Sequence, residues 1–103
     1  MKHFHRTTVL PDAALAEADA FFPTIGMKQT AAAARTRKYE GAGGEPGEAV
    51  SLELVVKMEG GHYTFVEART SAQGESRLDR GVKNYFTRLH KMADPRYALS
   101  ASY

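Results

Sequence analysis

Alternating apolar and polar positions predict two long strands in the second half of the chain. Every second residue from Val50 to Met58 is apolar, which is typical of a strand with one buried face. Glu59, Gly60 and Gly61 then predict a turn, because glycine reaches positive φ without a steric penalty. The chain should return as a second strand over residues 62–70.

The length of this turn decides which face of the returning strand is buried. A two-residue turn at 60–61 would put Tyr63 and Phe65 on the core side with Val56. A three-residue turn with a bulge would instead direct both rings outwards beside Val55. The residues buried in their place would be Thr64, Val66 and Ala68. The pattern leaves both registers open.

Helical spacing predicts one helix on each side of these strands. A strand from His3 to Leu10 should stop at Pro11, which suits the first turn of a helix over about 12–22. The second helix has apolar residues at offsets of 0, 4, 7, 8, 11 and 14 from Leu78, and Ser76 lies three residues before Asp79, as in a capping box. Its expected buried stripe is Leu78, Val82, Tyr85, Phe86, Leu89 and Met92.

The alanine-rich stretch over 27–42 lacks an apolar stripe, so we interpret it as two short strands that turn near 34–36. Gly41 to Glu48 holds four glycines and a proline and predicts a loop. The chain therefore predicts one α+β domain over 1–103. It should contain an antiparallel sheet of about five strands with two helices on one face, in the order β-α-β-β-β-β-α.

The composition narrows the class of protein. The 103 residues include no cysteine, which excludes disulfides and thiolate chemistry and favours a cytoplasmic location. We find no apolar run of membrane-spanning length and no signal-peptide pattern near the first residue, so we expect no membrane association. The net charge of +2 is too small to indicate a partner by itself.

The segments VLPDAALAEADAFFPTIG (9–26) and SRLDRGVKNYFTRLHKM (76–92), with the order of elements, give the chain a family resemblance. It resembles a minimal helix-grip or TBP-like β-α-β4-α domain of the START/polyketide-cyclase type. The resemblance implies the architecture and a ligand pocket beneath the last helix, although this chain is too short to enclose a deep cavity. A ferredoxin-like domain is the rival, and it would need a helix within 30–36.

Candidate catalytic and metal-binding residues are sparse. His3 and His5 should share one face of a strand, as a metal pair requires, but nothing demands a third ligand from His62, Glu40 or Glu67. His90 has no predicted orienting partner, and the chain contains no nucleophile or phosphate-binding motif. We therefore assign no catalytic residue, no metal site and no cofactor, and do not expect an enzyme.

Basic residues form two groups, one over 35–38 and one along the last helix. Their members are Arg35, Arg37 and Lys38, and then Arg77, Arg80, Lys83, Arg88 and Lys91. Glu75 and Asp79 interrupt the second group, and cations near a helix C-terminus complement its dipole. Both groups are typical of solvated faces, so nucleic-acid binding is not expected.

Three hypotheses follow for the function. If Val55, Tyr63 and Phe65 face outwards, they form an apolar patch of the kind that marks an interface, and a homodimer is the commonest way to bury one. This non-enzymatic, self-associating module is the preferred hypothesis. The second is a small-molecule pocket between the last helix and the sheet, with Glu67 or Arg69 as its anchor. The third is a weak nucleic-acid binder that uses the basic residues.

Overall fold

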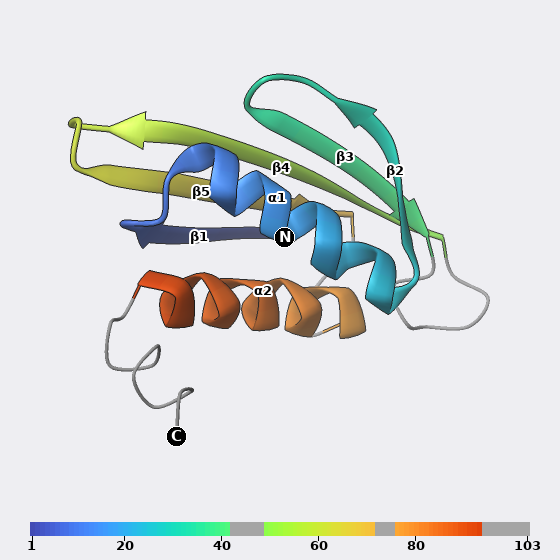
Figure 1. The fold of residues 1–103 in the computed structure, drawn as a ribbon. Helices are drawn as coiled ribbons and strands as arrows, with labels where there is room; N and C mark the ends of the chain where they lie inside the picture. The colour runs from blue at the N-terminus through green and yellow to red at the C-terminus, as the bar shows by residue number, and fades with distance from the viewer. Residues whose placement is uncertain (42–48, 72–75, 94–103) are drawn as a thin grey trace.

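Five strands form one antiparallel sheet in the computed structural model (Figure 1), which describes residues 1–41, 49–71 and 76–93. The spatial order of the strands is β1-β5-β4-β3-β2. Their bounds are β1 Lys2–Thr7, β2 Met27–Ala32, β3 Thr36–Gly41, β4 Val50–Glu59 and β5 Tyr63–Thr70. The first and second strands in the sequence thus lie at opposite edges of the sheet.

The helices α1 (Pro11–Phe21) and α2 (Arg77–Ala93) lie side by side on one face of this sheet (Figure 1). A short 3-10 helix, η1 (Phe22–Ile25), follows α1 and leads into β2. The observed order β-α-β-β-β-β-α confirms the predicted fold class. Within the described part of the chain, no helix has the length and apolar character needed to cross a membrane.

The register of β4 and β5 resolves the alternative that the sequence left open. Glu59 lies opposite Tyr63, so three residues (60–62) make the connection, and Val56 lies opposite Val66. Gly60 and Gly61 have φ angles of 63° and 73°, which only glycine adopts easily. The three-residue alternative is therefore correct. Thr64, Val66 and Ala68 face the helices, whereas Tyr63 and Phe65 face the opposite side of the sheet.

The two predicted strands in the alanine-rich stretch are confirmed as β2 and β3. Residues 30–36 hold the end of β2, a turn and the start of β3, so the ferredoxin-like alternative is wrong. The predicted extension of the first strand to Leu10 is also wrong. Strand β1 ends at Thr7, whose hydroxyl accepts a hydrogen bond from the Val9 amide at 3.1 Å and turns the chain towards Pro11. The predicted loop beyond Gly41 (42–48) and the final residues 94–103 lie outside the described residues.

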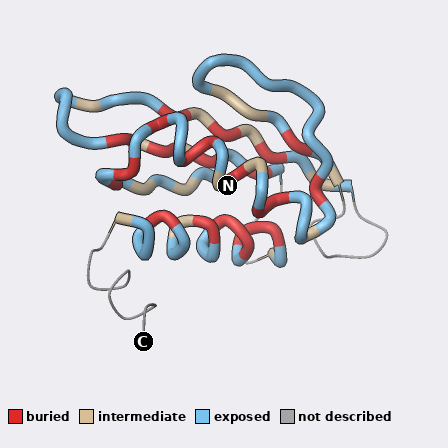
Figure 2. Tube along the Cα trace, in the orientation of Figure 1, coloured by how far each residue is buried: buried red, intermediate tan, exposed pale blue. Residues whose placement is uncertain are grey.

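The buried core lies between the helices and the sheet (Figure 2). Phe22 of η1 packs between two aromatic rings, with centroid distances of 5.2 Å to Tyr39 of β3 and 5.3 Å to Tyr85 of α2. The Tyr85 hydroxyl donates a hydrogen bond of 2.7 Å to the Ala14 carbonyl, and burial raises the pKa of Tyr85. The predicted stripe of α2 is correct except at its end, where Met92 is 50% exposed.

Two glycines allow close approach at the turn into β2. The Cα of Gly41 lies against the backbone carbonyl of Gly26, so that a Cβ at Gly41 would clash with that oxygen. Gly26 itself has a φ of 82° and caps η1 in the left-handed conformation. Gly81 of α2 similarly faces the side chain of Ile25. These contacts fix how η1 is held between β3 and α2.

Candidate functional site

The face of the sheet opposite the helices carries an aromatic patch, which we define as Phe4, Val55, Tyr63 and Phe65. The rings of Phe4 and Phe65 stack across β1 and β5, with centroids 5.6 Å apart and an interplanar angle of 28°. Phe4 is 56% exposed and Tyr63 is 52% exposed. The structure thus brings together on one face all three residues of the predicted interface, and it adds Phe4.

Two cations flank the aromatic patch. The Arg6 guanidinium lies 5.3 Å and the Lys57 ammonium 5.4 Å from the centroid of the Phe65 ring. Arg6 also forms an exposed ion pair of 3.3 Å with Glu59. Cation–π contacts of this kind are worth about 0.5–1 kcal/mol at exposed sites. The charges therefore surround the patch without covering Phe4 or Tyr63.

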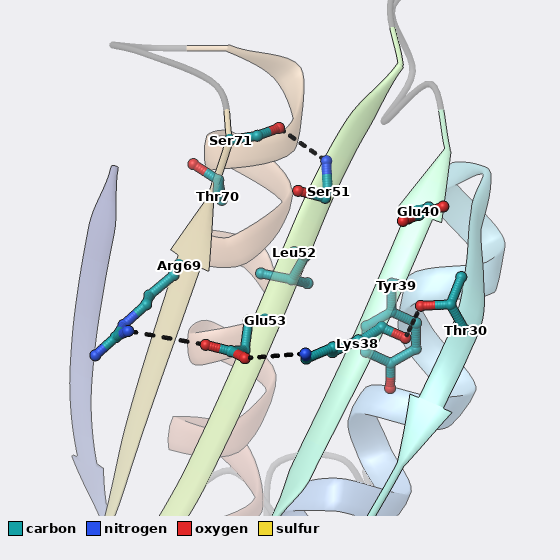
Figure 3. Close-up of a pocket in the computed structure, with 10 residues that line it drawn as sticks. All are labelled: Thr30, Lys38, Tyr39, Glu40, Ser51, Leu52, Glu53, Arg69, Thr70 and Ser71. Carbon is teal, nitrogen blue, oxygen red and sulfur yellow. Dashed lines mark hydrogen bonds and ion pairs between the residues drawn. The ribbon is translucent and has the colours of Figure 1, made fainter.

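A row of ion pairs crosses the same face towards β3 (Figure 3). Arg69 contacts Glu53 at 3.8 Å, and Glu53 contacts Lys38 at 3.7 Å. Arg69 also contacts Glu67 at 3.1 Å. Lys38, Glu53 and Arg69 border an open depression of about 380 Å³ on the polar part of the sheet. Other residues that line it are Thr30, Tyr39, Glu40, Ser51, Leu52, Thr70 and Ser71.

Glu67 and Arg69 were predicted to anchor a pocket between the last helix and the sheet. Both side chains lie on the face of the sheet opposite α1 and α2, because Val66, Ala68 and Thr70 occupy the alternating buried positions. That placement is therefore wrong, since a cavity beneath α2 would not contain them. Ligand binding by Glu67 and Arg69 on the open face stays a prediction, with Arg69 at the border of the depression.

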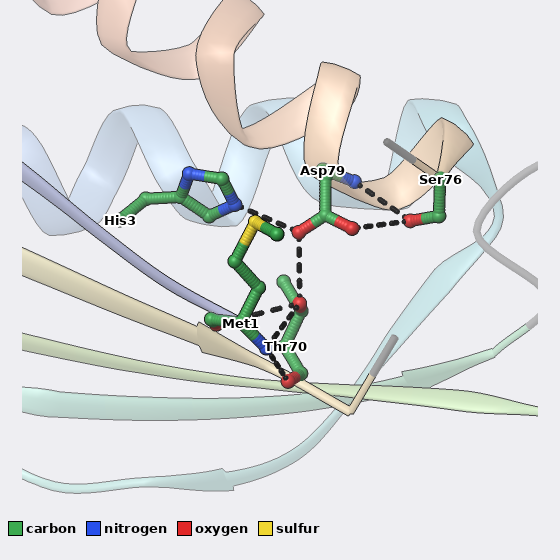
Figure 4. A network of polar contacts seen from close by, with 5 residues as sticks. All are labelled: Met1, His3, Thr70, Ser76 and Asp79. Carbon is green, nitrogen blue, oxygen red and sulfur yellow. Dashed lines mark hydrogen bonds and ion pairs between the residues drawn. The ribbon is translucent and has the colours of Figure 1, made fainter. Parts of the chain in front are cut away.

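A second polar cluster lies on the helix side, where β1, β5 and α2 meet (Figure 4). The Asp79 carboxylate is 1% exposed and accepts three hydrogen bonds. They come from His3 Nε2 at 2.7 Å, Thr70 Oγ1 at 2.8 Å and Ser76 Oγ at 2.6 Å. The amide of Asp79 donates back to Ser76 Oγ at 3.1 Å, so Ser76 caps α2. The terminal amino group of Met1 donates to the Thr70 carbonyl at 2.7 Å.

The electrostatics of Asp79 follow from these contacts. Burial alone would raise the pKa of its carboxyl, but hydrogen bonds from Ser76, His3 and Thr70 favour the charged form and together lower the pKa. The carboxylate is therefore ionised at neutral pH and satisfied on both oxygens.

A buried His–Asp pair is also part of many hydrolytic sites, where a hydroxyl nucleophile donates to the imidazole. Here the hydroxyls of Thr70 and Ser76 donate to Asp79 instead. The cluster links β1 and β5 to the start of α2, which is a structural role. Sequence reasoning found the Ser76–Asp79 cap but missed His3, because 76 positions separate it from Asp79.

The predicted pair of His3 and His5 is divided between two environments. His3 binds Asp79, whereas the His5 ring stacks on Phe86 of α2 with centroids 5.0 Å apart. Glu67, one of the suggested third ligands, lies on the opposite face of the sheet. Among the residues that the structure describes, no three His, Cys, Asp or Glu side chains come together in a group able to hold a metal ion.

Several of the basic residues that suggested nucleic-acid binding form ion pairs with carboxylates. Arg35 contacts Asp12 at 2.8 Å, and Arg37 contacts Asp19 at 3.2 Å beside the Tyr39 hydroxyl. In the second group, Arg88 contacts Glu17 at 3.0 Å. To bind nucleic acid, these arginines would have to give up their carboxylate partners and contact phosphate groups instead.

Comparison of the sequence with known protein families and with curated proteins finds no match.

Proposed function

We propose that this protein is a non-enzymatic module that forms a homodimer through the open face of its sheet, with the aromatic patch at the centre of the interface. The observation that carries the proposal is the stacked pair of Phe4 and Phe65 beside Tyr63, on a face that neither α1 nor α2 covers. Aromatic residues are enriched in interface cores, where they contribute large buried areas.

A second copy of the chain suits this face because its charges are of both signs. Arg6 and Lys57 lie beside the patch, and Glu59 and Glu67 lie on β4 and β5, two of the strands that carry the patch. In a two-fold interface the same surface of both copies is in contact. A face with interspersed cations and anions can therefore place each charge near an opposite charge of the second copy. A face of one sign would repel its own copy.

Sedimentation velocity over a series of protein concentrations tests the dimer. We expect dimers in the wild type and at least about tenfold weaker association in Phe4→Ser, because this substitution removes one aromatic side chain from the centre of the interface. Leu10→Ser is the matched control, since Leu10 is 66% exposed and lies in the connection between β1 and α1, outside the sheet. It should associate like the wild type.

A wild type that stays monomeric up to about 1 mM, the limit of weak association, would overturn the proposal. So would equal effects of the two substitutions, because the association would then not depend on the aromatic patch. Circular dichroism of each variant separates a lost interface from a lost fold.

The depression beside Arg69 supports a second candidate function, the binding of a small molecule. Its border carries Lys38 and Arg69 beside Glu40 and Glu53, which suits a ligand with both a carboxylate and an ammonium group. Nuclear magnetic resonance titration with free amino acids tests it, and shifts confined to these residues in the wild type but lost in Arg69→Ala would support it. The lack of cysteine supports a cytoplasmic location for either function.

A further inference from the structure

A small pocket of about 220 Å³ lies at the end of the sheet, where β1 leaves it and α2 ends. Its described lining consists of His5, Arg6, Thr7, Thr8, Tyr63, His90 and Ala93. Two imidazoles therefore share one pocket, although they come from opposite ends of the sequence. This pocket is distinct from the depression on the open face.

His5 has an unsatisfied nitrogen in this setting. Its Nε2 atom is buried and has no hydrogen-bond partner among the described residues. Buried polar atoms are nearly always paired, so an orphan nitrogen requires an explanation such as a ligand or an ion. The ring is also held in place, because it stacks on Phe86 with an interplanar angle of 15°.

The surroundings favour a cation over an anion. His90 and Ala93 belong to the last turn of α2, and the aligned peptide dipoles of a helix give its C-terminal end a partial negative charge. Arg6 is the one permanent cation in the described lining, and its guanidinium lies over Phe65 and pairs with Glu59 on the open face. Tyr63 and Thr8 add hydroxyl groups that can bind a metal-bound water.

We propose that His5 and His90 form a two-imidazole site for a divalent transition-metal ion of the zinc type. Neutral imidazole nitrogens are ligands that such ions prefer, and water would complete the coordination. Phe86 acts as a positioning residue, because its stacking fixes the orientation of the His5 ring. The site replaces the sequence-predicted partner of His5, which was His3, by a histidine 85 positions further along the chain.

Isothermal titration calorimetry of the tag-free, full chain with Zn²⁺ tests the site. We expect one ion per chain in the wild type, and affinity that is weaker by about tenfold or more in His5→Gln and in His90→Gln, by the scale of losses at metal sites. The matched control is His62→Gln in the β4–β5 turn, which should keep wild-type affinity. Mg²⁺, which prefers oxygen ligands, should not compete.

His90 is exposed, so His90→Gln should fold normally even if His5→Gln does not. A second readout is nuclear magnetic resonance of the imidazoles, where Zn²⁺ should shift the signals of His5 and His90 and leave those of His62 in place. Absence of Zn²⁺ binding by the wild type overturns the proposal. Unchanged affinity in His90→Gln, or shifts centred on His3 and Asp79, overturns it equally.

Discussion

The two faces of the sheet use the same strands for different purposes. On the helix side, Leu54, Val56 and Val66 are completely buried between sheet and helices. On the open side, their sequence neighbours Val55 and Phe65 are only partly covered. The helix side therefore determines the fold, while the open side is free to carry an interface. Substitutions on the two faces should separate these roles.

The largest difference is expected between the tyrosines of the two faces. Tyr85→Ala should lower the free energy of unfolding by about 4 kcal/mol, because it removes a buried ring and leaves the Ala14 carbonyl without its donor. Tyr63→Ala should change it by about 0.5 kcal/mol or less, since that ring is exposed. Urea denaturation at low protein concentration measures both. Similar losses would show that the open face also contributes to the core.

The Asp79 cluster should give the next largest effect. Asp79→Ala leaves His3, Thr70 and Ser76 without their acceptor and should cost about 3 kcal/mol. Because the folded-state pKa of Asp79 is lowered, its contribution is present above its ordinary pKa of 3.8 and is lost as the pH falls below that value. Denaturation of wild type and variant at several pH values should show their stabilities converging in acid. A gap that persists at low pH would assign the effect to packing alone.

Gly41→Ala should have an intermediate effect. Its new Cβ would meet the Gly26 carbonyl, which is backbone and cannot rotate away, so we expect a loss of about 2 kcal/mol. Gly61→Ala is a useful comparison, because it has open space around it and strain only from its φ of 73°. Thermal unfolding of both variants compares steric clash with backbone strain. A stable Gly41→Ala protein would mean that β2 can move away from β3 at this point.

The smallest effect is expected in the row of ion pairs on the open face. Arg69→Ala removes contacts with Glu67 and Glu53, but both pairs are accessible to water and should contribute about 0.5 kcal/mol or less. Urea denaturation at low and high salt checks this value. A loss above about 1 kcal/mol, larger than exposed pairs give, would indicate that the row is ordered more strongly than its exposure suggests.

The fold could be predicted from the sequence because local signals agreed with the global arrangement. Alternation predicted β4, helical spacing predicted α2, and Pro11 fixed the start of α1. The register of β5 could not be predicted, since both faces of that strand offer apolar residues and only the turn geometry decides between them. Met92 followed the apolar spacing of α2 but is half exposed.

The candidate sites were less predictable, because they depend on contacts between distant parts of the chain. The outward placement of Val55, Tyr63 and Phe65, the proposed interface residues, was predicted only as one of two alternatives. Asp19 gave no signal in the sequence, yet it accepts hydrogen bonds from both Arg37 and Tyr39. The two histidines of the H-x-H pair looked equivalent, and only α2 gives them different neighbours.

The position of β1 has a consequence for how the chain folds. Strands β2 to β5 each pair with the strand that follows or precedes them in the sequence, whereas β1 pairs only with β5, so that Lys2 lies opposite Arg69. Closing such a long loop costs entropy before any contact repays it. The β2–β5 meander should therefore form first and β1 should dock late, in the same step that brings His3 to Asp79. During synthesis, β1 has no partner strand until β5 has been made. Of the five strands, β1 is therefore the one we expect to exchange most readily between neighbouring molecules.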